Sequence, residues 1–213
     1  MDIAIVAYDD FTDLDVFLPW DVLNRVRRAD WRVRILGDGP ELRSAAGLRI
    51  PTHGPLEEAG AAAAVLFTSG PGARRLYRDE SFLRRFRLDP SRQLIGSMCS
   101  GALILASLGL LKGKRATTYP TSRALLAEFD AVEIVEEAFV REGNVATAAG
   151  CLSGADLAGW VIGELAGPAL RDDVLRSIQP VGRGLFFDDA ERVAALYRGD
   201  VSGERAEAGS RRG

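Results

Sequence analysis

Short runs of apolar residues alternate along the chain with segments whose apolar residues recur at helical spacing. The runs have the composition of buried strands, and we expect strands at 3–8, 31–36, 64–68, 93–97 and 132–135. Helical spacing predicts helices at 15–26, 82–88, 102–111, 153–165 and 169–178. Strands that alternate with helices predict an α/β domain, with a mostly parallel central sheet and helices on both of its faces.

The pattern also indicates where a site would lie. Residues 138–141 and 144–148 favour a hairpin with Gly143 in its turn. In a parallel sheet of this kind, ligands bind at the carboxyl ends of the strands. Three segments end a strand in a tight turn, and we expect them to converge at that edge: residues 9–15, 69–72 and 97–101.

The length of 213 residues suffices for one well-buried core, and we place a single domain at residues 1–200. The segment 201–213 consists mostly of Gly, Ser, Ala and charged residues, so we expect a disordered tail there. The net charge of −3 offers no basic surface for nucleic acid. No apolar run reaches the about 18 residues that a membrane helix needs, and the N-terminus lacks the basic segment of a signal peptide. We therefore expect a cytoplasmic protein with free thiols and a small-molecule partner, without a membrane or nucleic-acid partner.

The segment 93–111 holds the strongest functional signal. A buried strand runs directly into a helix, and Cys99 stands at the turn, with the small residues Ser97 and Gly101 two positions to either side. Such a nucleophile elbow strains the backbone of the nucleophile and excludes bulky neighbours. The helix N-terminus favours a thiolate, which predicts a lowered pKa for Cys99, and the Ser100 N–H points toward an anion that forms on the substrate.

Each candidate functional residue can also be explained by a purely structural role. Free cysteines are often buried packing residues, but the elbow favours a nucleophile at Cys99. Cys151 follows Gly150 without such a turn, and we interpret Cys151 as a packing residue. One histidine and two cysteines that we take to be distant form no ligand cluster, so no metal site is expected. The glycine pattern of a phosphate-binding loop is also missing.

A carboxylate is a better candidate than histidine to assist the thiol. The chain's one histidine, His53, lies in a predicted surface loop. Asp15 begins the first predicted helix among apolar residues, with Asp13 and Asp21 nearby. A carboxyl group in apolar surroundings holds a proton more readily, so Asp15 could carry a proton near neutral pH. The alternative, an aspartate that only stabilises the helix N-terminus, stays equally open at this point.

Taken together, the residues resemble the ThiJ/PfpI family of the class I glutamine-amidotransferase-like superfamily, and within it the isonitrile hydratases and related domains of some transcription regulators. The resemblance is carried by LDVFLPWDVL at 14–23, TSGPGARRL at 68–76, SMCSGALILASLGLLKGKRATTY at 97–119 and TAAGCLSGADLAGWVIGEL at 147–165. It implies a flavodoxin-like three-layer sandwich, a homodimer and no cofactor. We expect no regulator function, because no DNA-binding domain follows residue 180.

The resemblance also assigns roles to particular residues. Cys99 matches the family's nucleophile, and Asp15 matches the carboxylate that isonitrile hydratases place beside it. Gly70 and Ser100 match the residues whose backbone N–H groups face the substrate. Pro71 has no N–H to offer.

The chain departs from the family pattern at three places. Ser100 replaces a threonine, Tyr119 and Pro120 replace a His-Trp pair, and Cys151 stands at an apolar position. We expect Tyr119 to contribute to an apolar wall for the substrate, together with Leu14, Phe17 and Trp20.

The favoured function is hydration of isonitriles to N-substituted formamides through a thioimidate on Cys99, with Asp15 as the proton shuttle. One alternative is a glyoxalase-like enzyme that acts on small reactive carbonyls. Another is a non-enzymatic redox or ligand sensor, in which Cys99 is oxidised to a sulfinate.

Overall fold

The centre of the protein is a seven-stranded sheet. The computed structural model describes residues 1–199, so the predicted tail at 201–213 lies outside the described residues. The strand order is β10-β11-β7-β6-β1-β2-β5, and every neighbouring pair is parallel except the β10–β11 hairpin. The strands of this sheet are β1 (Asp2–Val6), β2 (Arg32–Gly37), β5 (Gly54–Pro55), β6 (Ala64–Phe67), β7 (Leu94–Met98), β10 (Phe139–Glu142) and β11 (Val145–Ala148).

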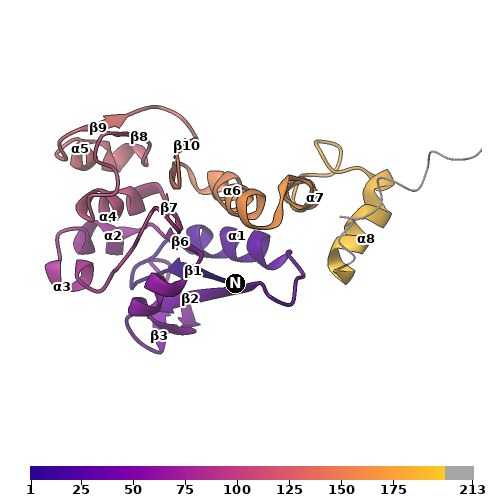
Figure 1. The fold of residues 1–213 in the computed structure, drawn as a ribbon, viewed down its shortest axis with the longest axis horizontal. Helices are drawn as coiled ribbons and strands as arrows, with labels where there is room; N and C mark the ends of the chain where they lie inside the picture. Colours follow the sequence, from indigo (N-terminus) through magenta and orange to yellow (C-terminus); the bar gives the residue numbers. More distant parts are fainter. Residues whose placement is uncertain (200–213) are drawn as a thin grey trace, which may run out of the picture.

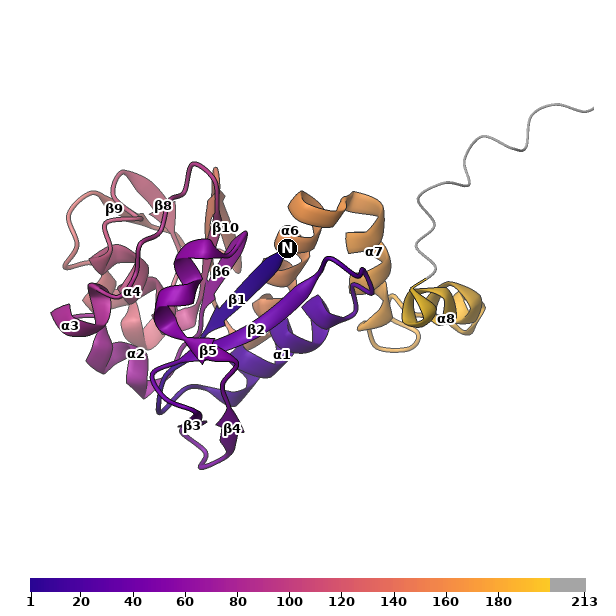
Figure 2. The same cartoon turned by 60° about the horizontal axis from the view of Figure 1, so that its bottom comes forward.

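Helices cover both faces of the sheet, as Figures 1 and 2 show. Alternate side chains of a strand point to opposite faces, so Ile3 and Ile5 pack with one helical layer while Ala4 and Val6 pack with the other. One layer consists of α1 (Asp13–Asn24), α6 (Gly154–Ala166) and α7 (Pro168–Ser177), and the other of α2 (Pro71–Leu76), α3 (Glu80–Leu83) and α4 (Ala102–Ser107). The predicted three-layer, flavodoxin-like architecture is confirmed.

Further strands and short helices lie outside the main sheet. Two more pairs of strands lie outside the main sheet, antiparallel β3 (Glu41–Arg43) with β4 (Arg49–Pro51) and parallel β8 (Lys114–Ala116) with β9 (Val132–Ile134). The remaining helices are α5 (Arg123–Leu126), α8 (Ala190–Arg198) and the 3-10 turns η1 (Leu56–Ala61), η2 (Cys99–Gly101), η3 (Pro120–Ser122), η4 (Cys151–Ser153) and η5 (Phe187–Asp189). No helix in the described part of the chain is long and apolar enough to cross a membrane.

Two helix predictions are wrong in extent. The helix expected at 82–88 is α3, which begins earlier and ends at Leu83. Asp79 sets its start by accepting hydrogen bonds from the N–H groups of Ser81 (2.9 Å) and Phe82 (3.2 Å). The helix expected at 102–111 ends with α4, and Gly109 beyond it adopts a φ of +76°.

The carboxyl ends of the parallel strands meet at one edge, as predicted. Ser69, after β6, accepts a hydrogen bond from the N–H of Thr12 (2.9 Å) in the loop that follows β1. Gly70 donates from its N–H to the hydroxyl of Ser100, which follows β7 (3.1 Å). These contacts tie the three predicted turns together.

We expect Gly101→Ala to lower the free energy of unfolding by about 1–3 kcal/mol, because a methyl group there must displace well-packed backbone. A Cβ atom at Gly101 would lie 2.5 Å from the carbonyl oxygen of Thr68 and 2.8 Å from that of Phe67. Urea unfolding measures the change. Gly39→Ala is the matched control, because the nearest atom to a Cβ at Gly39 is 3.8 Å away. Equal stability of the two variants would contradict the prediction.

Candidate active site

Cys99 occupies the elbow that the sequence predicted. It follows β7 immediately and begins η2, and its φ of +46° lies in the left-handed region that residues other than glycine rarely adopt. The side chain is buried, with 3% of the residue exposed. The flanking Ser97 and Gly101 are buried as well, so the elbow has no room for larger neighbours.

The structure brings Asp15 to Cys99. Asp15 stands in the first turn of α1 and is fully buried. Its Oδ2 accepts a hydrogen bond from the hydroxyl of Ser69, while Oδ1 has no hydrogen-bond partner among the described residues. A carboxylate oxygen of Asp15 lies within 4.8 Å of the Cys99 sulfur. This contact joins the loop after β1 to the end of β7.

Cys151 is the third member of this cluster, and the sequence analysis missed it. Its sulfur lies within 4.8 Å of both the Cys99 sulfur and an Asp15 carboxylate oxygen, and Cys151 is half-buried at the start of η4. The expectation that the two cysteines are distant from each other is therefore wrong. The signal lies in topology: β11 pairs with β7 in parallel, with Ala148 opposite Met98, so both cysteines follow strands that end side by side.

The electrostatics of the cluster favour protonated thiols. Burial raises the pKa of Cys99, and the negative charge of Asp15 raises it further. A hydrogen bond from the backbone N–H of Gly150 acts in the opposite direction, but it is the weaker effect. Burial and the neighbouring Asp15 carboxylate also raise the pKa of Cys151, to about 11. The expected lowering of the Cys99 pKa by the helix N-terminus is therefore wrong.

One of the two expected backbone donors, the N–H of Gly70, already has a partner. The N–H of Gly70 is bonded to the Ser100 hydroxyl, which in turn donates to the Gly70 carbonyl (3.3 Å). A substrate anion would have to replace that hydroxyl to use the Gly70 donor. The N–H of Gly150 already points at the Cys99 sulfur, and the sequence analysis did not single out this donor.

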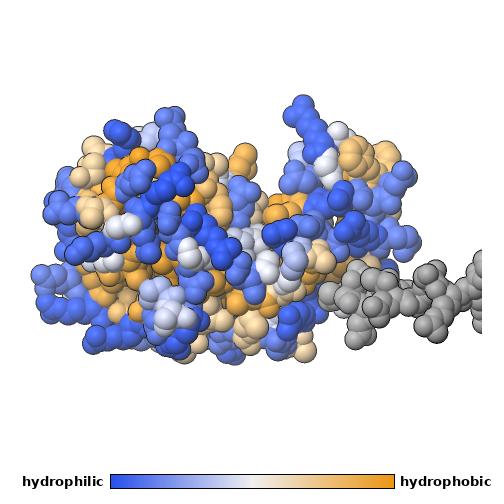
Figure 3. Space-filling model, turned by 45° about the horizontal axis from the view of Figure 1, so that its top comes forward, coloured by the Kyte–Doolittle hydropathy of each residue, from blue (hydrophilic) through white to orange (hydrophobic). Residues whose placement is uncertain are grey.

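A pocket of about 670 Å³ lies next to the nucleophile. Thr118 and Gly150 line it, and both contact Cys99: the Thr118 hydroxyl donates to the Cys99 carbonyl (2.8 Å), and the Gly150 N–H donates to the sulfur. Tyr119, Ile134 and Val135 add apolar surface. Figure 3 shows hydrophobic surface between hydrophilic residues at the end of the molecule that carries β8, β9 and α5.

Only one residue of the predicted apolar wall lines this pocket. Tyr119 does so with 43% of its surface exposed, whereas Leu14, Phe17 and Trp20 do not. Trp20 instead stacks on His53, with 5.2 Å between the ring centroids. The Nδ1 atom of His53 accepts a hydrogen bond from the backbone N–H of Ile35 (3.0 Å), so the histidine is engaged beside β2.

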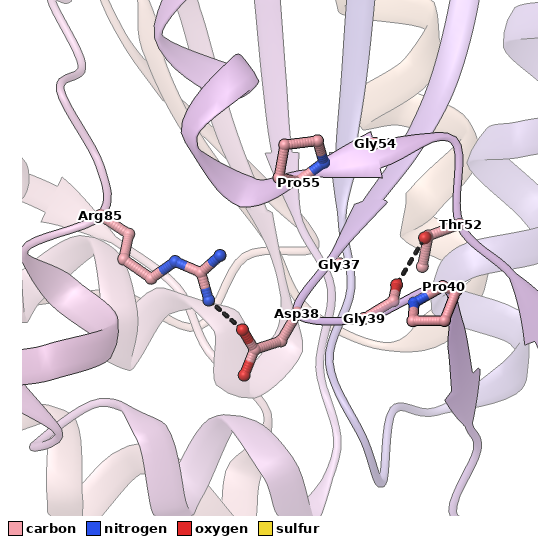
Figure 4. Close-up of a pocket in the computed structure, with 8 residues that line it drawn as sticks. All are labelled: Gly37, Asp38, Gly39, Pro40, Thr52, Gly54, Pro55 and Arg85. Carbon is pink, nitrogen blue, oxygen red and sulfur yellow. Dashed lines mark hydrogen bonds and ion pairs between the residues drawn. The ribbon is translucent and has the colours of Figure 1, made fainter.

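A second pocket, of about 250 Å³, lies at the end of β2 and is shown in Figure 4. The glycines Gly37 and Gly39 belong to its wall, together with Arg85. Arg85 pairs with Asp38 and, at 2.6 Å, with Glu57, so its positive charge is already matched. The hydroxyl of Thr52 in this pocket donates to the carbonyl of Gly39 (2.6 Å), and no thiol lines the pocket, so the Cys99 cluster is the stronger candidate for chemistry.

The cluster of Asp15, Cys99 and Cys151 also has the donor set of a soft metal site, with two sulfurs and one oxygen. Thiolates are the form that binds zinc or copper(I), whereas burial keeps both thiols protonated here. No histidine joins this group among the described residues. The expectation that the cysteines are too distant to form a ligand cluster is thus wrong.

Comparisons with known proteins show the family and support the fold. The profile of the DJ-1/PfpI family matches residues 1–163. An isonitrile hydratase from Pseudomonas putida is 30% identical over 169 residues, which cover 78% of this chain and 73% of the relative. An HTH-type transcriptional regulator from Pseudomonas aeruginosa is 25% identical over 189 residues. Those residues cover 88% of this chain but 56% of the regulator, so the similarity spans about half of that protein.

Solved structures show the same fold. A ThiJ/PfpI family protein from Pseudomonas syringae superposes with a TM-score of 0.73 at 24% identity, over 92% of this chain and 89% of that one. DJ-1 from Schizosaccharomyces pombe gives a TM-score of 0.72 at 17% identity, over 85% of this chain and 100% of that one.

The raised pKa of Cys99 predicts how its alkylation depends on pH. In a Cys151→Ser background, the rate of carbamidomethylation by iodoacetamide should rise about tenfold per pH unit from pH 7 to 9 without a plateau, because only the thiolate reacts. Asp15→Asn should speed labelling at each pH, because removing the negative neighbour lowers the pKa of Cys99.

Mass spectrometry of the labelled protein gives these rates. Asp13→Asn on the same helix turn is the control and should leave them unchanged. A plateau below pH 8 would contradict the raised pKa.

Proposed function

Because the chain belongs to the DJ-1/PfpI family and brings Cys99 and Asp15 together in one buried cluster, we propose that it hydrates isonitriles to N-substituted formamides. The observation that carries the proposal is the pairing of a strained, buried thiol with a carboxylate whose Oδ1 has no other partner among the described residues. The similarity to an isonitrile hydratase from Pseudomonas putida supports this choice of substrate class.

The first step adds the Cys99 thiol across the terminal carbon of the isonitrile. Asp15 accepts the thiol proton, the sulfur forms a bond to the carbon, and Asp15 returns the proton to that same carbon. The carbon–nitrogen triple bond becomes a double bond, and the product is a thioimidate on Cys99. A thiol that rests protonated suits this step, since the proton that the carbon needs comes from the sulfur.

The second step consumes one water molecule. The oxygen of the water attacks the thioimidate carbon while Asp15 takes one proton from the water. Asp15 then passes this proton to the nitrogen. The carbon–sulfur bond then breaks, Cys99 regains its proton, and the N-substituted formamide leaves. Ser69 holds Oδ2 throughout, so the same oxygen, Oδ1, serves both steps.

The pocket beside Cys99 accounts for the organic group of the substrate. Its apolar surface at Tyr119, Ile134 and Val135 fits an aryl or alkyl group, while Gly150 offers a donor at the sulfur where charge develops. Ser100 and Gly70 would supply further donors once the substrate displaces the Ser100 hydroxyl from the Gly70 N–H.

Turnover of a simple aryl isonitrile tests the proposal, with the formamide followed by chromatography. Cys99→Ala should abolish turnover, because the thioimidate cannot form. Asp15→Asn should lower kcat by about 100-fold or more, because an amide cannot shuttle the proton. Tyr119→Ala should raise KM for the aryl substrate with a smaller change in kcat, since Tyr119 lines the pocket but does not touch the reacting atoms.

Asp13→Asn is the matched control for Asp15→Asn, since Asp13 lies in the same helix turn but outside the cluster. It should keep wild-type turnover. A wild-type protein that forms no formamide, or an Asp15→Asn variant with full activity, would contradict the proposed function.

We also carry over from the family the proposal that the protein works as a cytoplasmic homodimer. A reducing compartment keeps the Cys99 thiol free, as the chemistry requires. Light scattering should give a molar mass twice that of the chain, and a monomer at micromolar concentration would contradict the dimer.

A further inference from the structure

The reaction proposed above makes no use of Cys151, although this residue is the nearest thiol to the nucleophile that the structure describes. The two sulfurs lie within 4.8 Å of each other, and no disulfide joins them. Asp15 lies within the same distance of both, so a proton acceptor serves either thiol. The two free thiols therefore form a pair, one buried and one half-buried, beside a carboxylate that can act as a base.

The two cysteines differ in exposure. Cys99 is 3% exposed, whereas Cys151 is half-buried. Each begins a three-residue 3-10 turn that leads into a helix, η2 before α4 and η4 before α6. Gly150 precedes Cys151 with a φ of +86°, and no atom lies within 4 Å of the position of a Cβ there. The backbone that precedes Cys151 therefore borders open space. A disulfide requires the two sulfurs to approach to about 2 Å.

We propose that Cys99 and Cys151 form a reversible intramolecular disulfide when the protein meets a hydroperoxide, and that Cys151 is oxidised first. Cys151 presents the more accessible sulfur, so the oxidant reaches it before it reaches the nucleophile. The disulfide then holds the Cys99 sulfur in a form that a thiol reductant can restore.

The chemistry balances in two steps. In the first, the sulfur of Cys151 attacks one oxygen of hydrogen peroxide while Asp15 accepts the thiol proton. A sulfur–oxygen bond forms, the oxygen–oxygen bond breaks, and the departing oxygen takes up the proton and leaves as water. In the second, the Cys99 sulfur attacks the sulfenic acid sulfur while Asp15 accepts the Cys99 thiol proton. The sulfur–oxygen bond breaks, and the departing hydroxyl takes up that proton and leaves as a second water. The two thiols are oxidised and one peroxide is reduced.

The consequence for the proposed hydratase rests on that proposed function. A Cys99 sulfur bound to Cys151 cannot attack an isonitrile, so oxidation switches the enzyme off and reduction switches it on again. The disulfide also keeps Cys99 from further oxidation to sulfinic acid, which thiol reductants do not reverse. By forming the disulfide, Cys151 therefore protects the Cys99 sulfur from irreversible oxidation.

The test begins with the reduced wild-type protein, prepared with a chelator so that no metal bridges the sulfurs. Treatment with hydrogen peroxide should give an intact mass lower by two hydrogens, with both free thiols lost and a Cys99–Cys151 cross-linked peptide in a non-reducing digest. Dithiothreitol should restore the mass and both thiols. A wild-type protein that gains oxygen atoms, or that keeps two free thiols, would overturn the proposal.

Two variants test the order of events. In Cys99→Ala, peroxide should produce a sulfenic acid on Cys151 that dimedone traps. In Cys151→Ser, labelling of Cys99 should be slower, and peroxide should slowly add two oxygen atoms that dithiothreitol cannot remove. Labelling of Cys99 as fast as that of Cys151 would overturn the order.

The disulfide proposal and the hydratase proposal can be contradicted independently of each other. Masses and thiol counts report the disulfide whether or not the protein hydrates isonitriles. If turnover is present, peroxide should abolish it in the wild type with full recovery in dithiothreitol. Whatever turnover Cys151→Ser has before oxidation, peroxide should abolish it, and dithiothreitol should not restore it.

Discussion

The burial of the Asp15 carboxyl group is the constraint on which the rest of the site depends. A buried carboxylate is costly unless donors surround it, and among the described residues no cation pairs with Asp15. The Ser69 hydroxyl supplies one hydrogen bond, and the two thiols are the remaining neighbours. The carboxyl group therefore links the turn after β6 to the ends of β7 and β11. Because Ser69 engages Oδ2, Oδ1 is the oxygen of this carboxyl group that can accept a proton.

The position of the nucleophile could be predicted because its requirements are local. A sharp turn from strand to helix needs small residues on both sides of Cys99, and the sequence displays that pattern within a few positions. The meeting of the three turns followed from the parallel sheet, whose carboxyl ends share one edge. The role of Asp15 could only be left open, because its approach to Cys99 depends on how α1 packs after the first strand.

Cys151 was missed because its place depends on strand order, which the hydrophobic pattern does not contain. The hairpin of β10 and β11 was visible in the sequence, but the parallel pairing of β11 with β7 was not. That register sets Ala148 opposite Met98, and it brings a residue far along the chain to the nucleophile. Helix ends were misplaced because apolar residues continue beyond the point where the helix stops, as at α4, which ends at Ser107 shortly before Gly109 with its φ of +76°.

Two opposing effects act on the pKa of Cys99, the helix N-terminus and burial, and the raised pKa shows that burial is the larger. A helix N-terminus stabilises a charge by about 0.3–1 kcal/mol, and by about 2 kcal/mol in favourable cases. Burial can cost a charged group about 4–7 kcal/mol, and here the negative Asp15 adds to that cost. The turn after Cys99 is also a 3-10 helix of three residues, so its dipole is short. Desolvation therefore outweighs the dipole, and the site holds a thiol where the motif alone suggested a thiolate.

A protonated, buried thiol has consequences for both proposals. It is a poor target for oxidants in water, which react with thiolates, yet it carries the proton that an isonitrile carbon must receive. Its neighbour Cys151 is more exposed, and the pKa of Cys151 is raised to about 11. Oxidation chemistry is thereby directed to the residue that the hydration reaction does not use. One desolvated carboxylate can then serve two reactions, because it accepts a proton from whichever of the two sulfurs reacts.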